Sequence, residues 1–210
     1  MKKWLKFLLS VGILLLALVF AIIYQFSYER SLVLCAVVFS FAGDLLLMNF
    51  LNVQRKLPYP QNFVCGMTCF AFAHILYMQS FAHRMSDKFC RSSVAGYITG
   101  MFILTFLVMC TLNVIFTSDQ KLDNKKLFIG CMVYGGVIGC NLICLSGYSL
   151  YSCAVTLNKL WFVPAMGIIC FFVSDCIIAI REFTLKKDKR TDRLVWIFYV
   201  LGQTLLILSK

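Results

Sequence analysis

Two aspartates, Asp44 and Asp175, lie inside long apolar stretches of this sequence. An aspartate at the centre of a membrane-spanning helix costs about 2.5 to 3.5 kcal/mol on insertion scales, so such residues usually face a bundle interior and mark functional sites. A structural hydrogen bond between helices is the alternative interpretation. Because there are two such residues and their expected depths agree, we favour a role in acid–base chemistry.

Other polar side chains lie in apolar stretches at the spacing that places two residues on one helical face. The pairs are Ser40 with Asp44, His74 with Tyr77, and Tyr199 with Gln203, while Ser174 directly precedes Asp175. A single His or Gln in such a position ordinarily bridges two helices. Their occurrence on the same helices as the aspartates, or on neighbouring ones, predicts one polar site shared by four helices.

The elements that must position these residues are membrane-spanning helices. The chain is 61% hydrophobic and only 14% charged, whereas about a quarter of the residues of a soluble domain are charged. A spanning helix needs about 20 mostly apolar residues. Seven such runs predict an all-α, polytopic transmembrane bundle that forms a single domain over residues 1–210. The predicted spans are Trp4–Phe26, Ser31–Leu51, Asn62–His83, Ser93–Phe116, Leu127–Tyr148, Leu160–Arg181 and Leu194–Ser209.

The basic residues between these spans predict the orientation of the bundle. Most of the 20 Lys and Arg residues fall in the segments that share a side with the N-terminus. Cytoplasmic loops are enriched in Lys and Arg, so we expect a cytoplasmic N-terminus and a C-terminus on the opposite side. With a rise of about 1.5 Å per residue, Asp44 and Asp175 would both lie about 10 Å from the cytoplasmic ends of their helices.

The 11 cysteines and two histidines bear on disulfides and metals. Most cysteines fall inside predicted spans, where free thiols act as small apolar residues. Cys90 and Cys153 fall in predicted outer loops and are the two that could pair. Catalytic zinc sites commonly use three ligands rich in His. We therefore expect no metal and no cofactor, although a zinc site of His74, Asp44 and Asp175, as in a ceramidase-like membrane hydrolase, stays an alternative.

From Ser40 to the C-terminus the sequence resembles the YhhN-like lysoplasmalogenases. The resemblance is carried by four ordered strings, which are Ser40-Phe-Ala-Gly43-Asp44 with Leu46-Leu47; Phe63, Gly66, Phe70, His74 and Tyr77; Gly167, Phe171, Ser174-Asp175, Ala179 and Phe183; and Tyr199, Gln203 and Ser209. Members of that family usually have eight spans, the second of which begins with a Lys-Pro pair. This chain has seven predicted spans and lacks that pair, which indicates a shortened N-terminus.

The resemblance implies hydrolysis of the vinyl ether bond of a lysoplasmalogen to a fatty aldehyde and a glycerophospho-headgroup. That reaction needs an acid, a carboxylate and a water molecule, much as a glycosidase pairs two carboxyl groups. Desolvation favours the protonated form of a carboxylic acid, so two buried aspartates can divide the roles of acid and carboxylate. We expect Asp44 and Asp175 to be catalytic, in an order left open. Ser40, His74, Tyr77, Ser174, Tyr199 and Gln203 would orient water or hold the substrate.

Two other functions use the same acids: a proton-coupled transporter, in which intramembrane acids relay protons, and a lipid-binding membrane protein. The expected partners are a lysophospholipid substrate and membrane lipids, with a homodimer as a further option. The formal net charge of +11 reflects membrane topology here, and we expect no nucleic acid partner. The favoured location is the plasma membrane of a bacterium.

Overall fold

The computed structural model describes residues 1–48, 61–86, 125–183 and 189–209. In these segments the long elements are six α-helices, each long and apolar enough to cross a membrane. They are α1 (Lys3–Ile23), α2 (Tyr28–Leu47), α3 (Gln61–Ser86), α5 (Lys125–Thr156), α6 (Phe162–Phe183) and α7 (Lys189–Leu208). A short 3-10 helix, η2 (Lys159–Trp161), leads into α6. The prediction of an all-α, multi-pass membrane bundle is confirmed.

Six of the seven predicted spans coincide with observed helices, and the fourth, Ser93–Phe116, lies outside the described residues. Two predicted ends were wrong. Helix α5 continues past Tyr148 to Thr156, and α7 begins at Lys189 rather than at Leu194. Hydropathy marks only the apolar part of a helix, whereas a polar first turn is still helical; in α7 the acidic Asp192 favours that helical N-terminus.

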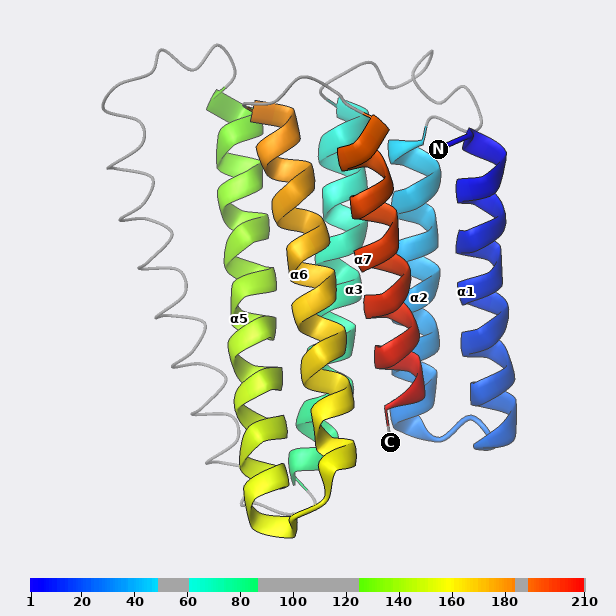
Figure 1. Ribbon diagram of the computed structural model, residues 1–210, viewed down its shortest axis with the longest axis vertical. Helices are drawn as coiled ribbons and strands as arrows, with labels where there is room; N and C mark the ends of the chain where they lie inside the picture. The colour runs from blue at the N-terminus through cyan, green and yellow to red at the C-terminus, as the bar shows by residue number, and fades with distance from the viewer. Residues whose placement is uncertain (49–60, 87–124, 184–188, 210) are drawn as a thin grey trace.

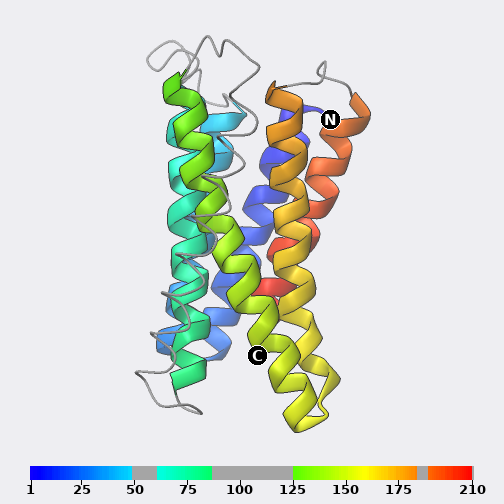
Figure 2. The same ribbon diagram turned by 90° about the vertical axis from the view of Figure 1, so that its left-hand side faces the viewer.

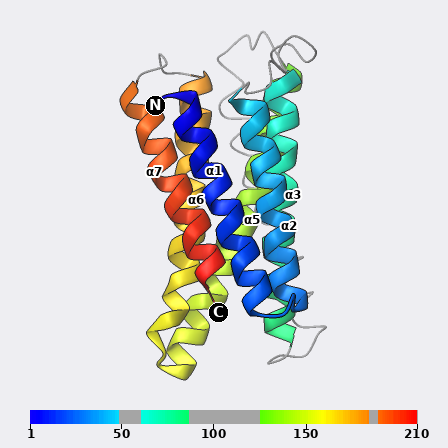
Figure 3. The same cartoon turned by 90° about the vertical axis from the view of Figure 1, so that its right-hand side faces the viewer.

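The six helices run roughly along one common direction (Figure 1), and their contacts close a ring. Around the ring, each of α1, α2, α3, α5, α6 and α7 contacts the next, and α7 closes the ring against α1. Figures 2 and 3 show the same arrangement from its two sides. Helices α1, α3, α5 and α7 begin at the end of the bundle where the N-terminus lies, which we call the amino end, and the last described residues of α7 lie toward the opposite end. Which end faces the cytoplasm stays a prediction.

The ring has apolar side chains on its outside and polar side chains in its interior. Outward-facing residues such as Leu15, Ile22 and Val133 are more than half exposed, as suits contact with lipid. Each of the six helices contributes a buried polar residue to the interior, namely Ser10, Asp44, His74, Asn141, Asp175 and Gln203. The interior of the bundle is therefore where chemistry can take place.

Two glycines bring α6 and α7 together next to this interior. A Cβ atom on Gly202 would lie 2.8 Å from the backbone nitrogen of Phe171, and one on Gly167 would lie 3.2 Å from the carbonyl oxygen of Gly202. Small residues allow helix backbones to approach closely in a membrane. This approach fixes the height of Asp175 on α6 relative to Tyr199 on α7.

Arg30 ties the beginning of α2 to the end of α7, far from the aspartates. Its buried guanidinium donates hydrogen bonds to the carbonyl oxygens of Ile207 (2.7 Å) and Ser209 (2.8 Å). It also stacks on the ring of Tyr24, 4.7 Å from the ring centre. The last carbonyl groups of a helix lack partners within the helix, and Arg30 donates to two of them; Arg84 also donates to the carbonyl oxygen of Ser209, at 3.4 Å.

The nine cysteines in the described residues are all free thiols, and most lie within helices, as predicted. Cys153 was placed in an outer loop from the sequence, but it lies in α5 because that helix is longer than expected. Cys90 is outside the described residues, so its pairing with Cys153 stays a prediction.

Candidate active site

The carboxyl group of Asp44 is buried near the end of α2 and receives two hydrogen bonds from other helices. Its Oδ2 atom accepts from the hydroxyl of Ser10 on α1 at 2.6 Å and from the hydroxyl of Tyr199 on α7 at 2.8 Å. Among the described residues, Oδ1 has no hydrogen-bond partner. Three helices therefore fix the position of this carboxyl group and leave one of its oxygens for a ligand.

Asp175, on α6, is held in a similar way by α5 and α3. Its Oδ2 atom accepts a hydrogen bond from the hydroxyl of Tyr134 at 2.9 Å. The Nε2 atom of His74 lies 3.5 Å from the same oxygen, which is too far for a strong hydrogen bond, and it has no closer partner in the part of the chain that the structure describes. The ring nitrogen and the carboxyl oxygen are therefore close enough for a long, weak contact.

Asn141 sets the tautomer of His74. Its amide nitrogen lies 3.2 Å from the backbone oxygen of His74, which can only accept, and 3.0 Å from the Nδ1 atom. The amide group therefore donates to both atoms, so Nδ1 is an acceptor and the ring proton lies on Nε2, which faces Asp175. The edge of this ring also packs against Phe171, with the ring centres 4.5 Å apart. His74 is thus a fixed donor directed at the second aspartate.

Aromatic rings pack together beside the two carboxyl groups. Phe70 makes edge contacts with both Phe171 (6.2 Å between ring centres) and Tyr199 (6.0 Å). Phe70 also packs on the backbone of α2, where a Cβ atom on Gly43 would lie 2.7 Å from the ring. The glycine that precedes Asp44 is therefore needed for space.

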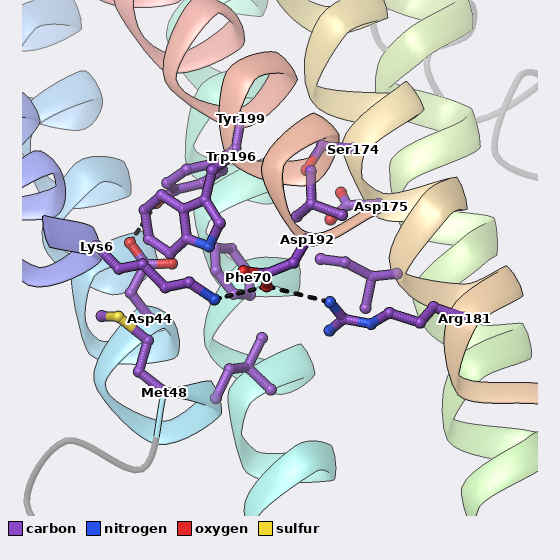
Figure 4. A pocket seen from close by; sticks show the side chains of 13 residues that line it. Lys6, Asp44, Met48, Phe70, Ser174, Asp175, Arg181, Asp192, Trp196 and Tyr199 are labelled. Carbon is purple, nitrogen blue, oxygen red and sulfur yellow. Dashed lines mark hydrogen bonds and ion pairs between the residues drawn. The ribbon is translucent and has the colours of Figure 1, made fainter. Parts of the chain in front are cut away.

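Both aspartates line one pocket of about 80 Å³, shown with its side chains in Figure 4. At about 30 Å³ for each water molecule, this volume holds two or three waters or a small part of a ligand. Tyr199, Phe70 and Ser174 line it together with the apolar residues Leu47, Met48, Ile178 and Val195. The Ser174 hydroxyl is buried there and has no hydrogen-bond partner within the described segments. The pocket thus combines two acids, unsatisfied donors and an apolar wall.

Charged side chains surround the pocket at the amino end of the bundle. The Oδ1 atom of Asp192 contacts the Nζ atom of Lys6 at 2.6 Å and the Nη1 atom of Arg181 at 3.4 Å. The amino group of Met1 contacts Oδ2 at 2.8 Å. The side chains of Lys6, Asp192 and Arg181 are 16%, 19% and 20% exposed, against 7% for Asp175. Access to the pocket therefore increases toward this cluster.

Three residues predicted for the site lie in a separate buried network. The hydroxyl of Tyr77 donates to Oε1 of Gln203, whose Nε2 atom donates to the hydroxyl of Ser40 at 2.9 Å. Ser40 lies one turn from Asp44, and Gln203 lies one turn from Tyr199, on the side away from the amino end. None of the three lines the pocket. Through Ser40 and Gln203 this network lies one turn from Asp44 and Tyr199, and its role in holding a ligand stays a prediction.

The structure brings Asp44, Asp175, Ser174 and Tyr199 to one pocket, while His74 lies beside Asp175 and does not line that pocket. Neither aspartate faces lipid. Asp44 is closer to its helix end than expected, because α2 is described as ending at Leu47. Among the described residues, no group of three His, Cys, Asp or Glu side chains is arranged to hold a metal ion.

Several residues around the aspartates were missed from the sequence, namely Lys6, Ser10, Tyr134, Asn141, Arg181 and Asp192. Asn141 could have been found, because an amide in the middle of an apolar span needs a partner just as an aspartate does. Tyr134 precedes it by two turns on the same face of α5. Ser10, Lys6, Arg181 and Asp192 gave no such signal, since small hydroxyl residues and charges at span ends are common.

The ring of spanning helices around two buried aspartates defines an integral membrane protein with a paired-carboxyl pocket. The model of the YhhN family matches residues 4–210. The chain therefore belongs to the YhhN family, the family of lysoplasmalogenases. The match includes α1, with Ser10 and Lys6, and so extends further than the resemblance from Ser40 onward. No curated protein and no solved structure shows a significant match.

Proposed function

We propose that this protein is a membrane hydrolase that cleaves the vinyl ether bond of lysoplasmalogens by acid–base catalysis at Asp44 and Asp175. The observation that carries the proposal is the shared pocket. Two carboxyl groups from different helices line one small space, and each uses Oδ2 for protein hydrogen bonds while Oδ1 has no partner among the described residues. Membership of the YhhN family supports the same reaction.

The chemistry begins with protonation of a carbon atom. One aspartic acid transfers its proton to the outer carbon of the vinyl ether double bond, which leaves an oxocarbenium ion at the carbon attached to oxygen. The other aspartate stabilises this cation and accepts a proton as water adds to the same carbon. This division of roles parallels that of the paired carboxyl groups in glycosidases. The resulting hemiacetal breaks its bond to the glycerol oxygen, which takes up a proton, and releases the aldehyde.

The surrounding residues would assist these steps. His74, with its proton on Nε2 at 3.5 Å from Asp175, would help to orient that carboxyl group. Tyr134 and Tyr199 fix the orientations of the two acids. The apolar side chains of Met48, Ile178 and the other aliphatic lining residues would contact the first carbons of the alkenyl chain. Preorganised groups of this kind lower the barrier because they need no rearrangement during the reaction.

The test is aldehyde release by the purified protein from a lysoplasmalogen, with the matching ester lysolipid and saturated ether lysolipid as controls. We expect turnover of the vinyl ether alone. Asp44→Asn and Asp175→Asn keep size and hydrogen bonding but cannot exchange a proton, so each should reduce turnover about 100-fold or more. Glu29→Gln is the matched control, because Glu29 lies at the other end of the bundle, beside His83.

The position of bond cleavage is a second readout. If water adds to the alkenyl carbon, a reaction in water labelled with a heavy oxygen isotope places the label in the aldehyde. The glycerophospho product then carries no label. Label in the glycerophospho product would show that water attacks the glycerol carbon and that the bond between this carbon and the ether oxygen is cleaved. The proposed mechanism would then be wrong. Wild-type turnover in both well-folded Asn variants would make the aspartates packing residues and exclude them from catalysis.

A further inference from the structure

The charged cluster of Lys6, Arg181 and Asp192 is the feature of the pocket that hydrolysis of the vinyl ether does not use. Two cationic side chains from α1 and α6 meet at a single carboxylate oxygen, that of Asp192 on α7 (Figure 4). The amino group of Met1 adds a third positive group at the other oxygen. Among the described residues, this cluster has more positive than negative charge while being largely shielded from solvent, an arrangement that favours a further anion.

The donors in this cluster are not saturated by Asp192. The Arg181 contact, at 3.4 Å, is long for a charge-assisted hydrogen bond, and the buried Nε atom of Arg181 has no partner among the described residues. A guanidinium can bind a phosphate through two parallel hydrogen bonds, and an ammonium binds phosphate as a point charge. Arg181 and Lys6 therefore offer a phosphate more hydrogen bonds than the Asp192 carboxylate accepts from them.

We propose that Lys6 and Arg181 bind the phosphate of a lysophospholipid headgroup, with Asp192 holding the two cations in place until the lipid arrives. This inference rests on the proposed function for the identity of the lipid, and it names the part of the substrate that the aspartates do not recognise.

The spacing of the cluster from the acids fits such a substrate. Lys6 lies one turn, about 6 Å, before Ser10, the residue that contacts Asp44, and Arg181 lies about 9 Å along α6 from Asp175. In a lysoplasmalogen, six covalent bonds separate the phosphorus from the vinyl ether carbon that is attached to oxygen and that water attacks. Six bonds span about 7 Å. A phosphate at the cluster would therefore place the vinyl ether beside the two carboxyl groups.

The orientation also agrees with exposure and membrane depth. The cluster is the more exposed part of the pocket, at the end of the bundle, whereas the acids are deeper. A polar headgroup would thus remain near the membrane surface while the vinyl ether reaches the acids. The apolar tail would extend further into the membrane.

A binding experiment with non-hydrolysable probes tests this assignment apart from catalysis. The probes are a saturated alkyl ether lysophospholipid and the alkyl glycerol that lacks its phosphate headgroup. Wild-type protein should bind the first more tightly. Lys6→Gln and Arg181→Gln should each weaken binding of the lysophospholipid about tenfold, the loss expected for one charge-assisted hydrogen bond. Binding of the alkyl glycerol should not change, which also shows that each variant is folded.

Arg190→Gln is the matched control, because Arg190 lies in the first turn of α7 but is exposed and does not line the pocket. It should bind both probes as the wild type does. Equal affinity of wild type for the two probes, or unchanged lysophospholipid binding in both Gln variants, would overturn the assignment. Inorganic phosphate is a further competitor: if it bound as tightly as the lysophospholipid, the site would take free phosphate instead of a lipid headgroup.

These outcomes separate the inference from the proposed reaction. If the protein hydrolyses a vinyl ether but the Gln variants bind both probes normally, the reaction stands and the phosphate site is wrong. If no vinyl ether is cleaved but lysophospholipid binding depends on Lys6 and Arg181, the phosphate site stands and the reaction is wrong.

Discussion

Gly43→Ala tests whether packing beside Asp44 sets the geometry of the pocket. The added Cβ would lie 2.7 Å from Cε2 and 2.9 Å from Cδ2 of Phe70, whereas carbon atoms in contact prefer about 3.5 to 4.0 Å. The ring must therefore move by about 1 Å, but it is held by Phe171 and Tyr199 on its other sides. Overpacking of this kind costs about 1 to 3 kcal/mol. For a chain of this size, 2 kcal/mol corresponds to a fall of about 4 to 8 °C in the unfolding midpoint.

Activity should fall further than stability in this variant. A shift of Phe70 pushes on Tyr199, whose hydroxyl holds Asp44, and a misplacement of about 1 Å in a catalytic group can cost on the order of 100-fold in rate. Thermal unfolding and aldehyde release are the assays. Gly12→Ala is the matched control, because nothing lies within 4 Å of the added atom, and alanine in a helix is favoured over glycine.

A second substitution can confirm the cause. Phe70→Leu removes the atoms that clash, so it should be less harmful in the Gly43→Ala background than in the wild type, with a coupling of about 1 kcal/mol or more. Additive effects of the two substitutions, or equal behaviour of Gly43→Ala and Gly12→Ala, would refute the packing argument.

Two further predictions concern single contacts. Tyr134→Phe removes the hydroxyl that donates to Asp175 and should reduce aldehyde release about tenfold. Tyr151→Phe, on the exposed face of the same helix, should not reduce it. Equal rates in the two variants would show that the hydrogen bond to Asp175 is not needed. Arg30→Gln removes two charge-assisted hydrogen bonds to the end of α7 and should lower stability by about 2 to 4 kcal/mol without changing turnover per folded molecule; an unchanged unfolding midpoint would contradict the role assigned to Arg30.

The spans and the two aspartates could be predicted because both follow from the cost of polar groups in lipid. An apolar run of sufficient length has few alternatives to a spanning helix, and an aspartate within it needs a polar interior. The same rule, applied to Asn141, would have led to the residue that fixes His74. Helix ends were less accurate, since the polar first turn of α7 resembles a loop in sequence.

Which polar residues share a contact could not be read from the sequence, because it depends on the order of the helices around the ring. Helical spacing placed Gln203 on the same face as Tyr199, and the structure agrees. The two residues differ by one turn of height, so Tyr199 lines the pocket and holds Asp44, whereas Gln203 bonds to Ser40 in the buried network. Lys6 and Asp192 are far apart in sequence, and their contact follows from α7 closing the ring against α1. The charged cluster therefore required the three-dimensional arrangement.

The arrangement of polar layers along the bundle bears on the choice between a hydrolase and a proton-coupled transporter. A transporter alternates access to its central acids from the two sides of the membrane. Here the acids are reached past Lys6, Asp192 and Arg181, and exposure falls toward Asp175.

On the other side of Asp44, the described residues Ser40, Tyr77 and Gln203 are fully or almost fully buried and are hydrogen-bonded to one another across α2, α3 and α7. Breaking this network to open a second path would leave several buried polar groups without partners, each at a cost of about 1 to 3 kcal/mol. Among the described residues, the pocket thus has a buried, hydrogen-bonded layer on one side of its acids and charged side chains on the other, which agrees with the proposed reaction of a substrate that keeps its headgroup at the surface and does not cross the membrane.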